Sequence, residues 1–371
     1  MTVMPAKKRK KKSDLPAQAH EGAKEAFRRP SIKDVARFAG VSHPTVSRAL
    51  RRSPLVKPAT AERIRQIAAE AGYHVSAAAR GLKTRRTRSI GLVATSIADP
   101  FTSCVASGIE QTARDLGYAV MLADSNADPE REQKIVQAFA EQRVDGILVT
   151  SSRVGALYLP LLEKMRVPIV LINDQHSGEF THSVMIANRT GARMAVEHLI
   201  SLGHRRIAYI GDRFGYQSDA ERHSGYRDAL REAQIEGASE MEASGDGKPA
   251  AAEQAMEQVL ALLEPPTAVF CYNDMSALGA MRAIRRRGLR IPADISVCGF
   301  DDLFLAAYLD PPLTTVRQPM RRMGELAVKH LVKLINGEEA EVRVRVKAEL
   351  VIRQSTGPAP AKQIEGQKTP R

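Results

Sequence analysis

The sequence predicts an α/β protein that carries a small all-α head at its amino end. Three observations support this fold class. Excess positive charge is confined to the first quarter of the chain, short helical patterns occupy residues 31–72, and apolar strand-like runs alternate with amphipathic runs from residue 89 onward. The 371 residues are enough for two or three globular units.

The charge distribution points to a polyanionic partner for the head. Residues 1–88 hold 22 Lys+Arg and 6 Asp+Glu, whereas residues 89–371 hold 33 and 36. Clustered basic side chains of this kind bind nucleic acid through its phosphates. The alternative is a solvated basic tail. Residues 1–30, with six consecutive basic residues at 7–12, are predicted to form a disordered basic arm.

The cysteine and histidine pattern predicts neither a disulfide framework nor a metal site. Cys104, Cys271 and Cys298 are an odd number in apolar surroundings, which favours reduced core residues in a cytoplasmic protein. His198 and His204 are expected at surface or capping positions. No apolar run is long enough to span a membrane, and no secretory signal follows the basic segment. No cofactor motif is found, and we expect neither a cofactor nor a catalytic residue.

The head shows the spacing of a helix-turn-helix. Ser31 and Asp34 have the spacing of a capping box for a helix that ends near Gly40. A second helix is predicted over residues 43–50 and a third over 58–72. Small and apolar residues at the crossing point let the first two helices pack closely, which is typical of the motif.

The residues of the head resemble the lactose-repressor family of bacterial transcription regulators. The resemblance lies in residues 32–36 (Ile-Lys-Asp-Val-Ala), 39–42 (Ala-Gly-Val-Ser), 45–48 (Thr-Val-Ser-Arg) and 72–73 (Gly-Tyr), and it continues into 79–82 and 89–93. It covers about residues 31–356. It implies a transcription regulator that places its second helix in the major groove of DNA.

The resemblance assigns DNA contacts to the second helix and the loop after it. His43, Pro44 and Arg48 would face base edges, with Arg48 suited to a bidentate contact with guanine and Pro44 to an apolar one. Phosphate contacts suit the flanking residues. The candidate DNA-binding residues of the head are His43, Pro44, Thr45, Ser47, Arg48, Arg51 and Lys57.

Residues 76–88 resemble the family's hinge helix and linker, which follow a head of residues 31–75. Leu82 would insert into a base step of the minor groove, with Ala79 and Lys83 beside it. The alternative is an ordinary linker that happens to hold an apolar residue. The chain departs from the family at Val75-Ser76, where Pro-Asn is usual, and at Lys57, which replaces a capping Ser.

The segment 89–356 predicts parallel sheets that are covered by helices on both faces. Strands are predicted over residues 90–93, 119–123, 146–149, 169–172, 207–210, 268–271 and 295–299. Polar residues follow these strands, and ligands of open α/β sheets bind beyond the carboxyl ends of the strands. The alternative for any single Asn or Asp there is a turn or a helix cap.

The resemblance implies a two-subdomain core similar to periplasmic binding proteins. The chain would cross three times, giving an N-subdomain of residues 89–187 plus 319–347 and a C-subdomain of 188–318 plus 348–356. Residues 357–371 are predicted to be a disordered tail.

The resemblance also assigns the effector site. Phe101, Arg222, Asn273 and Asp301 match effector-binding positions of the family, whereas four further residues are chosen only from their position after strands or at a helix start. Those four are Asp99, Arg153, Asp174 and Ser218. The crossover sequence at 185–188 and the absence of an aromatic residue at 246–248 depart from the family, and they leave the ligand open.

We therefore expect a cytoplasmic, sequence-specific regulator of a metabolic operon, most simply a repressor. It would bind a palindromic operator as a homodimer or tetramer and respond to a small polar metabolite such as a sugar or sugar acid. A purine or nucleoside effector is the alternative. A periplasmic sugar-binding protein would share the core but needs an export signal and no basic head. An enzyme would need a catalytic constellation that the sequence does not show.

Overall fold

The computed structural model describes residues 30–73, 86–152, 154, 165–175, 182–236 and 239–361. Contacts divide the chain into two units, one that ends at Arg86 and one that begins at Thr87. We call them the head and the core and describe each by itself. The predicted hinge residues 76–85, the arm residues 1–29 and the tail residues 362–371 lie outside the described residues.

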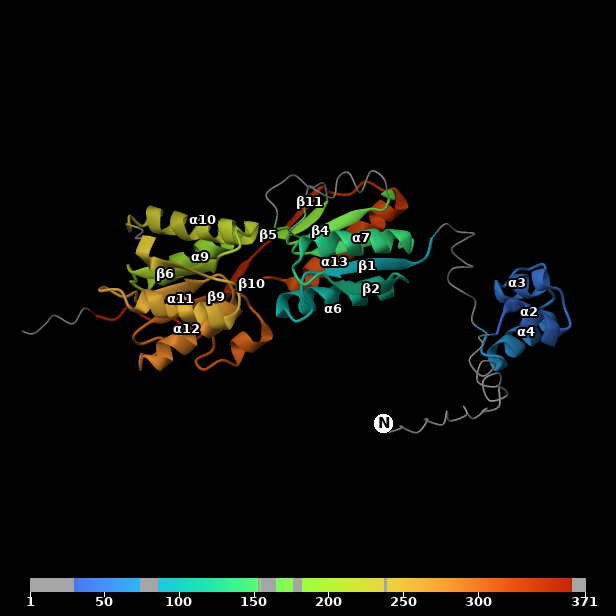
Figure 1. The fold of residues 1–371 in the computed structure, drawn as a ribbon, viewed down its shortest axis with the longest axis horizontal. Helices are drawn as coiled ribbons and strands as arrows, with labels where there is room; N and C mark the ends of the chain where they lie inside the picture. The colour runs from blue at the N-terminus through green and yellow to red at the C-terminus, as the bar shows by residue number, and fades with distance from the viewer. Residues whose placement is uncertain are drawn as a thin grey trace, which may run out of the picture. The chain divides into compact units, whose positions relative to one another are not determined.

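The described residues of the head form three helices (Figure 1), which pack around a small apolar cluster. They are α2 (Ile32–Ala39), α3 (His43–Leu50) and α4 (Pro58–Glu70). The Asp34 carboxylate accepts from the Ser31 N–H at 2.9 Å, and the Asp34 N–H donates to the Ser31 hydroxyl, so the predicted capping box is confirmed. Val46 of α3 and Ile64 of α4 are completely buried between the helices. The predicted helix-turn-helix is confirmed.

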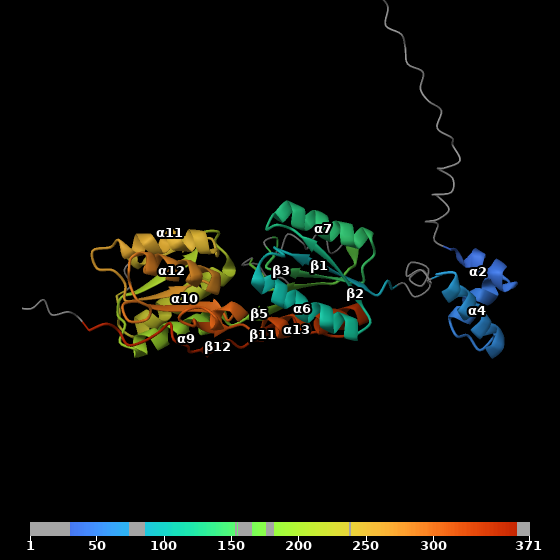
Figure 2. The same ribbon diagram turned by 90° about the horizontal axis from the view of Figure 1, so that it is seen from below.

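The core contains two six-stranded sheets, of which the first is parallel throughout. Its strand order is β11-β5-β4-β3-β1-β2. The strands are β1 (Ser89–Ala94), β2 (Ala119–Asp124), β3 (Gly146–Thr150), β4 (Ile169–Ile172), β5 (Ser183–Ile186) and β11 (Arg343–Val346). Helices α6 (Pro100–Asp115) and α13 (Met320–Asn336) cover one face, and α7 (Pro129–Glu141) covers the other (Figure 2).

The second sheet has the order β12-β10-β9-β8-β6-β7, with only β12 antiparallel to its neighbour. Its strands are β6 (Ile207–Asp212), β7 (Glu242–Gly245), β8 (Ala268–Cys271), β9 (Ser296–Asp301), β10 (Thr314–Arg317) and β12 (Glu349–Val351). Helices α9 (Asn188–Ser201) and α10 (Gln217–Glu232) cover one face, and α11 (Pro249–Leu260) and α12 (Asp274–Arg286) the other. The described residues of the core also form the short 3-10 helices η2 (Ser239–Met241) and η3 (Phe304–Ala307).

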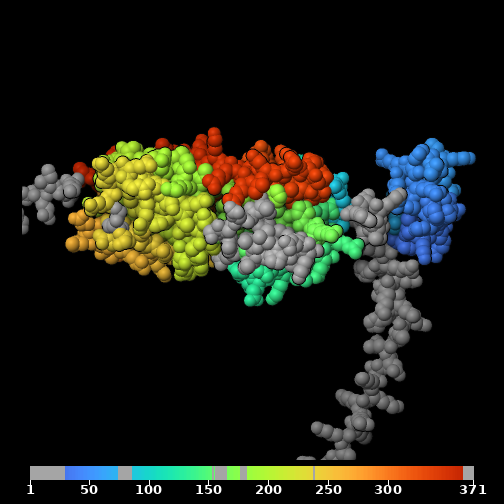
Figure 3. All heavy atoms as spheres, turned by 90° about the horizontal axis from the view of Figure 1, so that it is seen from above, coloured from blue at the N-terminus to red at the C-terminus, as the bar shows by residue number. Residues whose placement is uncertain are grey.

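The chain passes between the two sheets three times. It leaves the first sheet after β5, returns between β10 and α13, and leaves again between β11 and β12. Figure 3 shows the last of these segments, in red, lying across both lobes of the core. We call the lobe of the first sheet the N-subdomain and that of the second the C-subdomain. The predicted two-subdomain α/β core is confirmed.

Two sequence-based expectations differ from the structure. Residues 357–361 of the predicted disordered tail pack on the C-subdomain, where the Gly357 N–H donates to the Ser296 hydroxyl at 3.0 Å and the Ala359 N–H to the Leu202 carbonyl at 2.9 Å; for residues 362–371 the expectation stays a prediction. His204 is completely buried, not on the surface, because its ring lies between Ser296 and Thr267 and bonds to this same segment.

The described helices include none that is long and apolar enough to cross a membrane. Cys271 and Cys298 are buried, and Cys104 is half-buried; all three are free thiols.

Candidate DNA-binding surface and effector site

Helix α3 presents a polar face to solvent. His43, Pro44 and Arg48 are exposed, whereas Val46 and Ala49 are buried against the other helices. Pro44 lies in the first turn, where the missing N–H leaves no helical hydrogen bond unmade. The half-buried Thr45 hydroxyl lies 2.8 Å from that of Ser42, and Ser47 is also half-buried.

The cations beside α3 are not neutralised by nearby carboxylates. Within the described residues, no ion pair is formed by Arg48, Arg51 or Lys57, and all three side chains are exposed. By contrast, Arg37 pairs with Asp34 and Arg65 pairs with Glu62 on the other helices. The α3 side of the head therefore carries free positive charge for phosphates. Ala79, Leu82 and Lys83 lie outside the described residues, so their DNA contacts stay predictions.

In the core, the candidate effector site centres on Arg222, which α10 places beside the carboxyl ends of β8 and β9. Its guanidinium is only 2% exposed and lies 3.8 Å from the ring centre of Phe300 and 4.7 Å from that of Tyr272. The Nε–H donates to the Asn188 side chain at 3.0 Å, and Nη1 donates to the Tyr272 carbonyl at 2.6 Å. Cation–π contacts and neutral acceptors thus hold a buried charge in a fixed position.

Asp301 is the anionic group nearest to this guanidinium. Its carboxylate lies 3.9 Å from Arg222 Nη1 and accepts from Gln318 Nε2 at 2.5 Å. Burial raises the pKa of Asp301 to about 7; the charge of Asp99 adds to the rise, while Arg222 and Gln318 oppose it. This carboxyl group therefore titrates near neutral pH and can accept or donate a hydrogen bond.

Two predicted site residues are also helix caps. Asp99 is the N-cap residue of α6, and its side chain accepts from the Phe101 N–H at 3.1 Å. Asn273 is the N-cap residue of α12, and its side chain accepts from the Ser276 N–H at 2.8 Å. The capping role that the sequence left open is thus present at both positions. Phe101 is only 6% exposed and packs in the apolar cluster of the N-subdomain.

The remaining predicted residues differ in their surroundings. Asp174 is buried after β4, and Ser218 is 1% exposed, with its hydroxyl 2.7 Å from both the Gln175 amide oxygen and the Tyr272 hydroxyl. Arg153 lies outside the described residues. Asn173 Oδ1 and Gln318 Oε1 are buried without a hydrogen-bond partner among the described residues. Unfilled acceptors at strand ends are suited to ligand groups that donate.

The structure adds residues that the sequence did not single out as effector ligands. Asn188 and Gln318 lie at the crossings between subdomains, and Gln175 lies two positions after Asn173. They carry no strong motif. Tyr272 and Phe300, in contrast, directly precede predicted residues, so a search one residue upstream of each strand-end Asn or Asp finds them.

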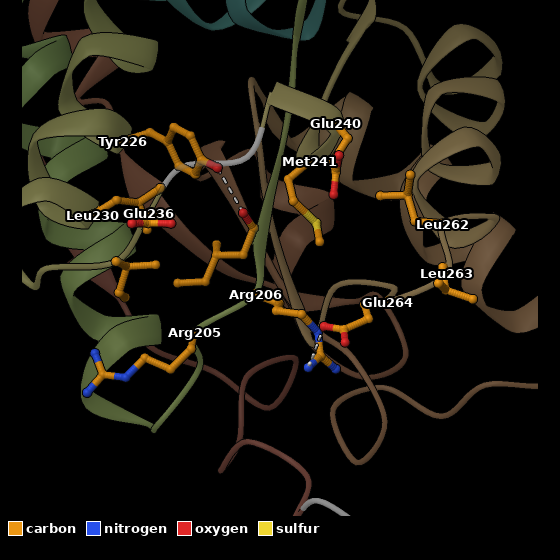
Figure 4. A pocket seen from close by; sticks show the side chains of 12 residues that line it. Arg205, Arg206, Tyr226, Leu230, Glu236, Glu240, Met241, Leu262, Leu263 and Glu264 are labelled. Carbon is orange, nitrogen blue, oxygen red and sulfur yellow. Dashed lines mark hydrogen bonds and ion pairs between the residues drawn. The ribbon is translucent and has the colours of Figure 1, made fainter.

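A separate pocket lies at the opposite end of the C-subdomain sheet (Figure 4). It measures about 500 Å³ and has Tyr226 and Leu230 on its apolar side and Arg205 and Glu264 on its rim. It adjoins Ile207, the first residue of β6, whereas the candidate effector residues lie beyond the last residues of the strands. It is therefore distinct from the candidate site.

Both parts of the chain match known protein families. Residues 31–76 match the model of bacterial regulatory proteins of the lacI family. Residues 196–356 match the periplasmic binding protein-like domain.

The relatives match over nearly their full length. The HTH-type transcriptional repressor PurR of Aliivibrio fischeri (strain MJ11) is 37% identical over 329 residues, which cover 88% of this chain and 98% of that protein. PurR of Serratia proteamaculans (strain 568) is 36% identical over 333 residues, which cover 89% and 98%.

Two solved structures share the fold. The lac repressor dimer bound to operator and the anti-inducer ONPF is 31% identical with a TM-score of 0.82, and the match covers 89% of this chain and 100% of that one. The complex of the transcriptional regulator CelR with cellobiose is 32% identical with a TM-score of 0.68 over 88% and 100%. With its helix-turn-helix head and its two-subdomain core, the chain belongs to the lacI family of bacterial regulatory proteins.

Proposed function

We propose that this regulator is a homodimer that represses a metabolic operon by binding a palindromic operator with its two heads. A small polar effector binds at Asp99, Phe101, Asp174, Ser218, Arg222, Asn273 and Asp301, with Arg153 as a further candidate. The observation that carries the effector site is Arg222: a buried guanidinium held by neutral acceptors, whose Nη2 bonds to no described residue.

The chemistry of this site suits a ligand with several hydroxyl or amide groups. Arg222 supplies donors, the unpaired oxygens of Asn173 and Gln318 supply acceptors, and Asp301 supplies either, depending on its protonation. A sugar or sugar acid meets these demands, and a purine or nucleoside is the alternative. The solved relatives include complexes with cellobiose and with ribose.

A thermal-shift screen against sugars, sugar acids, nucleosides and purine bases tests the sensor. A ligand that binds only the folded state raises the melting temperature by mass action. We expect a hit in one class and its loss in Arg222→Ala. The matched control is Arg193→Ala, an exposed arginine on α9. An unchanged shift in Arg222→Ala places the effector elsewhere.

A DNA-binding measurement tests the head. DNA sites are selected from a random pool with the full chain, and affinity is then measured by fluorescence anisotropy. We expect Arg48→Ala to weaken the selected site by about 10- to 100-fold and binding to fall steeply with salt. The control is Arg65→Ala on α4, which pairs with Glu62. Equal affinity of Arg48→Ala and the unaltered chain contradicts the assignment.

Exposed apolar residues on the N-subdomain support a dimer. β2 is the edge strand of its sheet, and its Met121 and Leu122 side chains are 37% and 53% exposed. Ile97 is 55% exposed, and its N–H donates to Asp124 at the end of β2. An apolar unpaired edge strand invites a partner chain.

The C-subdomain contributes a second apolar element beside it. Leu303 packs in the same apolar cluster as α6. The adjacent η3 begins with Phe304 and is followed by Tyr308; these side chains are 78% and 83% exposed, with ring centres 6.5 Å apart. Exposed aromatic pairs are typical of protein interfaces. We propose that the two elements belong to one pairing surface.

We infer further that the protein acts in the bacterial cytoplasm, where its operator lies, and that it turns over no substrate. Incubating the effector with the protein and measuring product tests the second statement. Stoichiometric binding without product is expected.

A further inference from the structure

We propose that Gln175 is a positioning residue that holds the two subdomains together by capping α10 from the opposite subdomain. The proposal rests on the proposed function in one respect, since α10 carries the effector residue Arg222. The contacts themselves are properties of the core alone.

The N-cap residue of helix α10 does not cap the helix with its side chain. Its N-cap residue is Tyr216, whose side chain accepts no hydrogen bond from the helix. The first N–H groups of a helix need an external acceptor. Here the Gln175 side-chain oxygen accepts from the Ser218 N–H at 3.2 Å and from the Ser218 hydroxyl at 2.7 Å, while the Gln175 carbonyl accepts from the Gln217 N–H at 3.4 Å.

Gln175 is at the same time fixed within the N-subdomain. Its N–H donates to the Ser152 carbonyl at 3.0 Å, and its side-chain Nε2 donates to the Asn173 carbonyl at 2.7 Å. A backbone carbonyl can only accept, and the backbone N–H of Ser218 can only donate. These two partners therefore define which end of the amide is oxygen and which is nitrogen.

One turn of α10 connects Gln175, through Ser218, to the effector residue Arg222. Ser218 and Arg222 are four residues apart on α10 and lie on one side of it. The Ser218 hydroxyl gives its only hydrogen to Gln175, so the Tyr272 hydroxyl must donate to Ser218. Arg222 donates to the carbonyl of the same Tyr272. Displacing Gln175 from α10 thus disturbs the support of Arg222.

A consequence follows for movement between the subdomains. Separating them breaks the three contacts to α10 and leaves its first turn without an acceptor, because no described residue of its own subdomain takes that place. Gln175 therefore favours the arrangement seen here, and an effector that favours another arrangement must overcome these bonds.

Hydrogen–deuterium exchange of the full chain, without effector or DNA, tests the cap. In Gln175→Ala we expect peptides containing Gln217 and Ser218 to exchange about tenfold faster. The start of α12, which Asn273 caps within one subdomain, should be unchanged. Gln175→Glu keeps an acceptor for α10 and should keep its protection within about twofold. Equal exchange in Gln175→Ala and the unaltered chain overturns the proposal, as does exchange in Gln175→Glu as fast as in Gln175→Ala.

A distance measurement separates coupling from a local cap. Spin labels are attached at Gln137→Cys and Leu263→Cys, exposed positions on different subdomains, in a Cys104→Ser background diluted with unlabelled protein. We expect Gln175→Ala to broaden the distance distribution and shift it. Asp128→Ala removes a cap of the same kind from α7 but within one subdomain, so it should leave the distribution unchanged.

An unaltered distribution in Gln175→Ala, or an equal change in Asp128→Ala, overturns the coupling. Neither experiment involves a ligand. Failure to find an effector in the thermal-shift screen therefore leaves both results interpretable.

Discussion

Two adjacent carboxylates at the end of β9 show how strongly local surroundings decide the chemistry of a residue. Asp302 forms ion pairs with Arg317 at 2.7 Å and with Arg353 at 2.6 Å. Asp301 points to the buried side, where its nearest cation, Arg222, is 3.9 Å away. Both have positive φ values, 57° for Asp302 and 120° for Asp301, so the backbone turns sharply between the two environments.

The raised pKa of Asp301 predicts a pH dependence of stability. Its pKa rises from 3.8 to about 7 on folding, mainly through burial. The folded state then holds this proton more tightly than the unfolded chain does. The contribution of Asp301 to the free energy of unfolding is complete below about pH 4 and is lost as the pH rises through about 7. Asp301→Asn cannot ionise, so its melting temperature should fall less between pH 5 and pH 8, by about 2–5 °C.

The control for this measurement is Asp294→Asn. Arg290 lowers the pKa of the half-buried Asp294 to about 2, so the contribution of this group to stability is constant between pH 5 and pH 8. An Asp301→Asn variant with the pH slope of the unaltered chain contradicts the assignment of the titrating group.

Because His204 is buried and hydrogen-bonded, we expect its substitution to lower the stability of the fold. Its Nε2 bonds to the Gly357 carbonyl, which only accepts, so Nε2 carries the proton and Nδ1 accepts from Thr267. Burial lowers the pKa of His204. The contribution of this residue to the stability of the fold is therefore present above pH 6.5 and is lost as the pH falls. His204→Ala should lower the free energy of unfolding in urea by about 2–3 kcal/mol. The exposed His43→Ala should leave it unchanged, and a similar loss in both variants refutes the role.

At the scale of elements, α6 and α13 pack at unusually short range. A Cβ at Gly108 would lie 2.2 Å from the Arg321 carbonyl oxygen, and a Cβ at Gly324 would lie 2.4 Å from that of Val105. Each glycine therefore faces the backbone of the other helix. Gly108→Ala should lower the free energy of unfolding by about 1–3 kcal/mol in a denaturant titration. Gln111→Ala, on the exposed side of α6, should change it by less than about 0.5 kcal/mol. Equal effects of the two variants contradict the close packing.

The sequence predicts the buried strands well and the marginal strands poorly. β3 and β4 are continuous apolar runs with every residue buried, which is why their patterns are unmistakable. β7 (Glu-Ala-Ser-Gly) and β11 (Arg-Val-Arg-Val) are edge strands of four residues with few apolar side chains. Their pairing depends on neighbours far away in the chain, which local patterns do not contain.

The same limit applies to the candidate site. Residues at strand ends, such as Asn273 and Asp301, are predictable because the carboxyl ends of parallel strands converge. Gln175 and Gln318 are not, because their importance comes from partners in another segment: Ser218 for the first and Asp301 for the second. Only the folded chain brings these pairs together.

At the scale of the whole core, three crossings of the chain join the two lobes. Each lobe has its own apolar clusters, and the contacts between the lobes are both apolar, where Leu303 packs in the cluster of α6, and polar, such as that of Gln175 with Ser218. A ligand that binds at the same strand ends would contact both lobes, so the proposed effector could favour one arrangement of the lobes over another. The predicted effector site occupies that position.

The exposed apolar residues of the edge strand β2 predict how two chains pair. Leu122 lies on the edge strand β2 and is 53% exposed, so a carboxylate there should prevent the edge from being buried against a second chain. We expect Leu122→Asp to shift the sedimentation coefficient from that of a dimer to that of a monomer. Its affinity for a palindromic DNA site should fall at least tenfold, because one chain then engages only one half-site. Leu263→Asp is the matched control, since Leu263 is fully exposed on the C-subdomain away from this face. A Leu122→Asp variant that remains dimeric moves the pairing surface elsewhere, and dissociation by Leu263→Asp moves it to the far end of the C-subdomain.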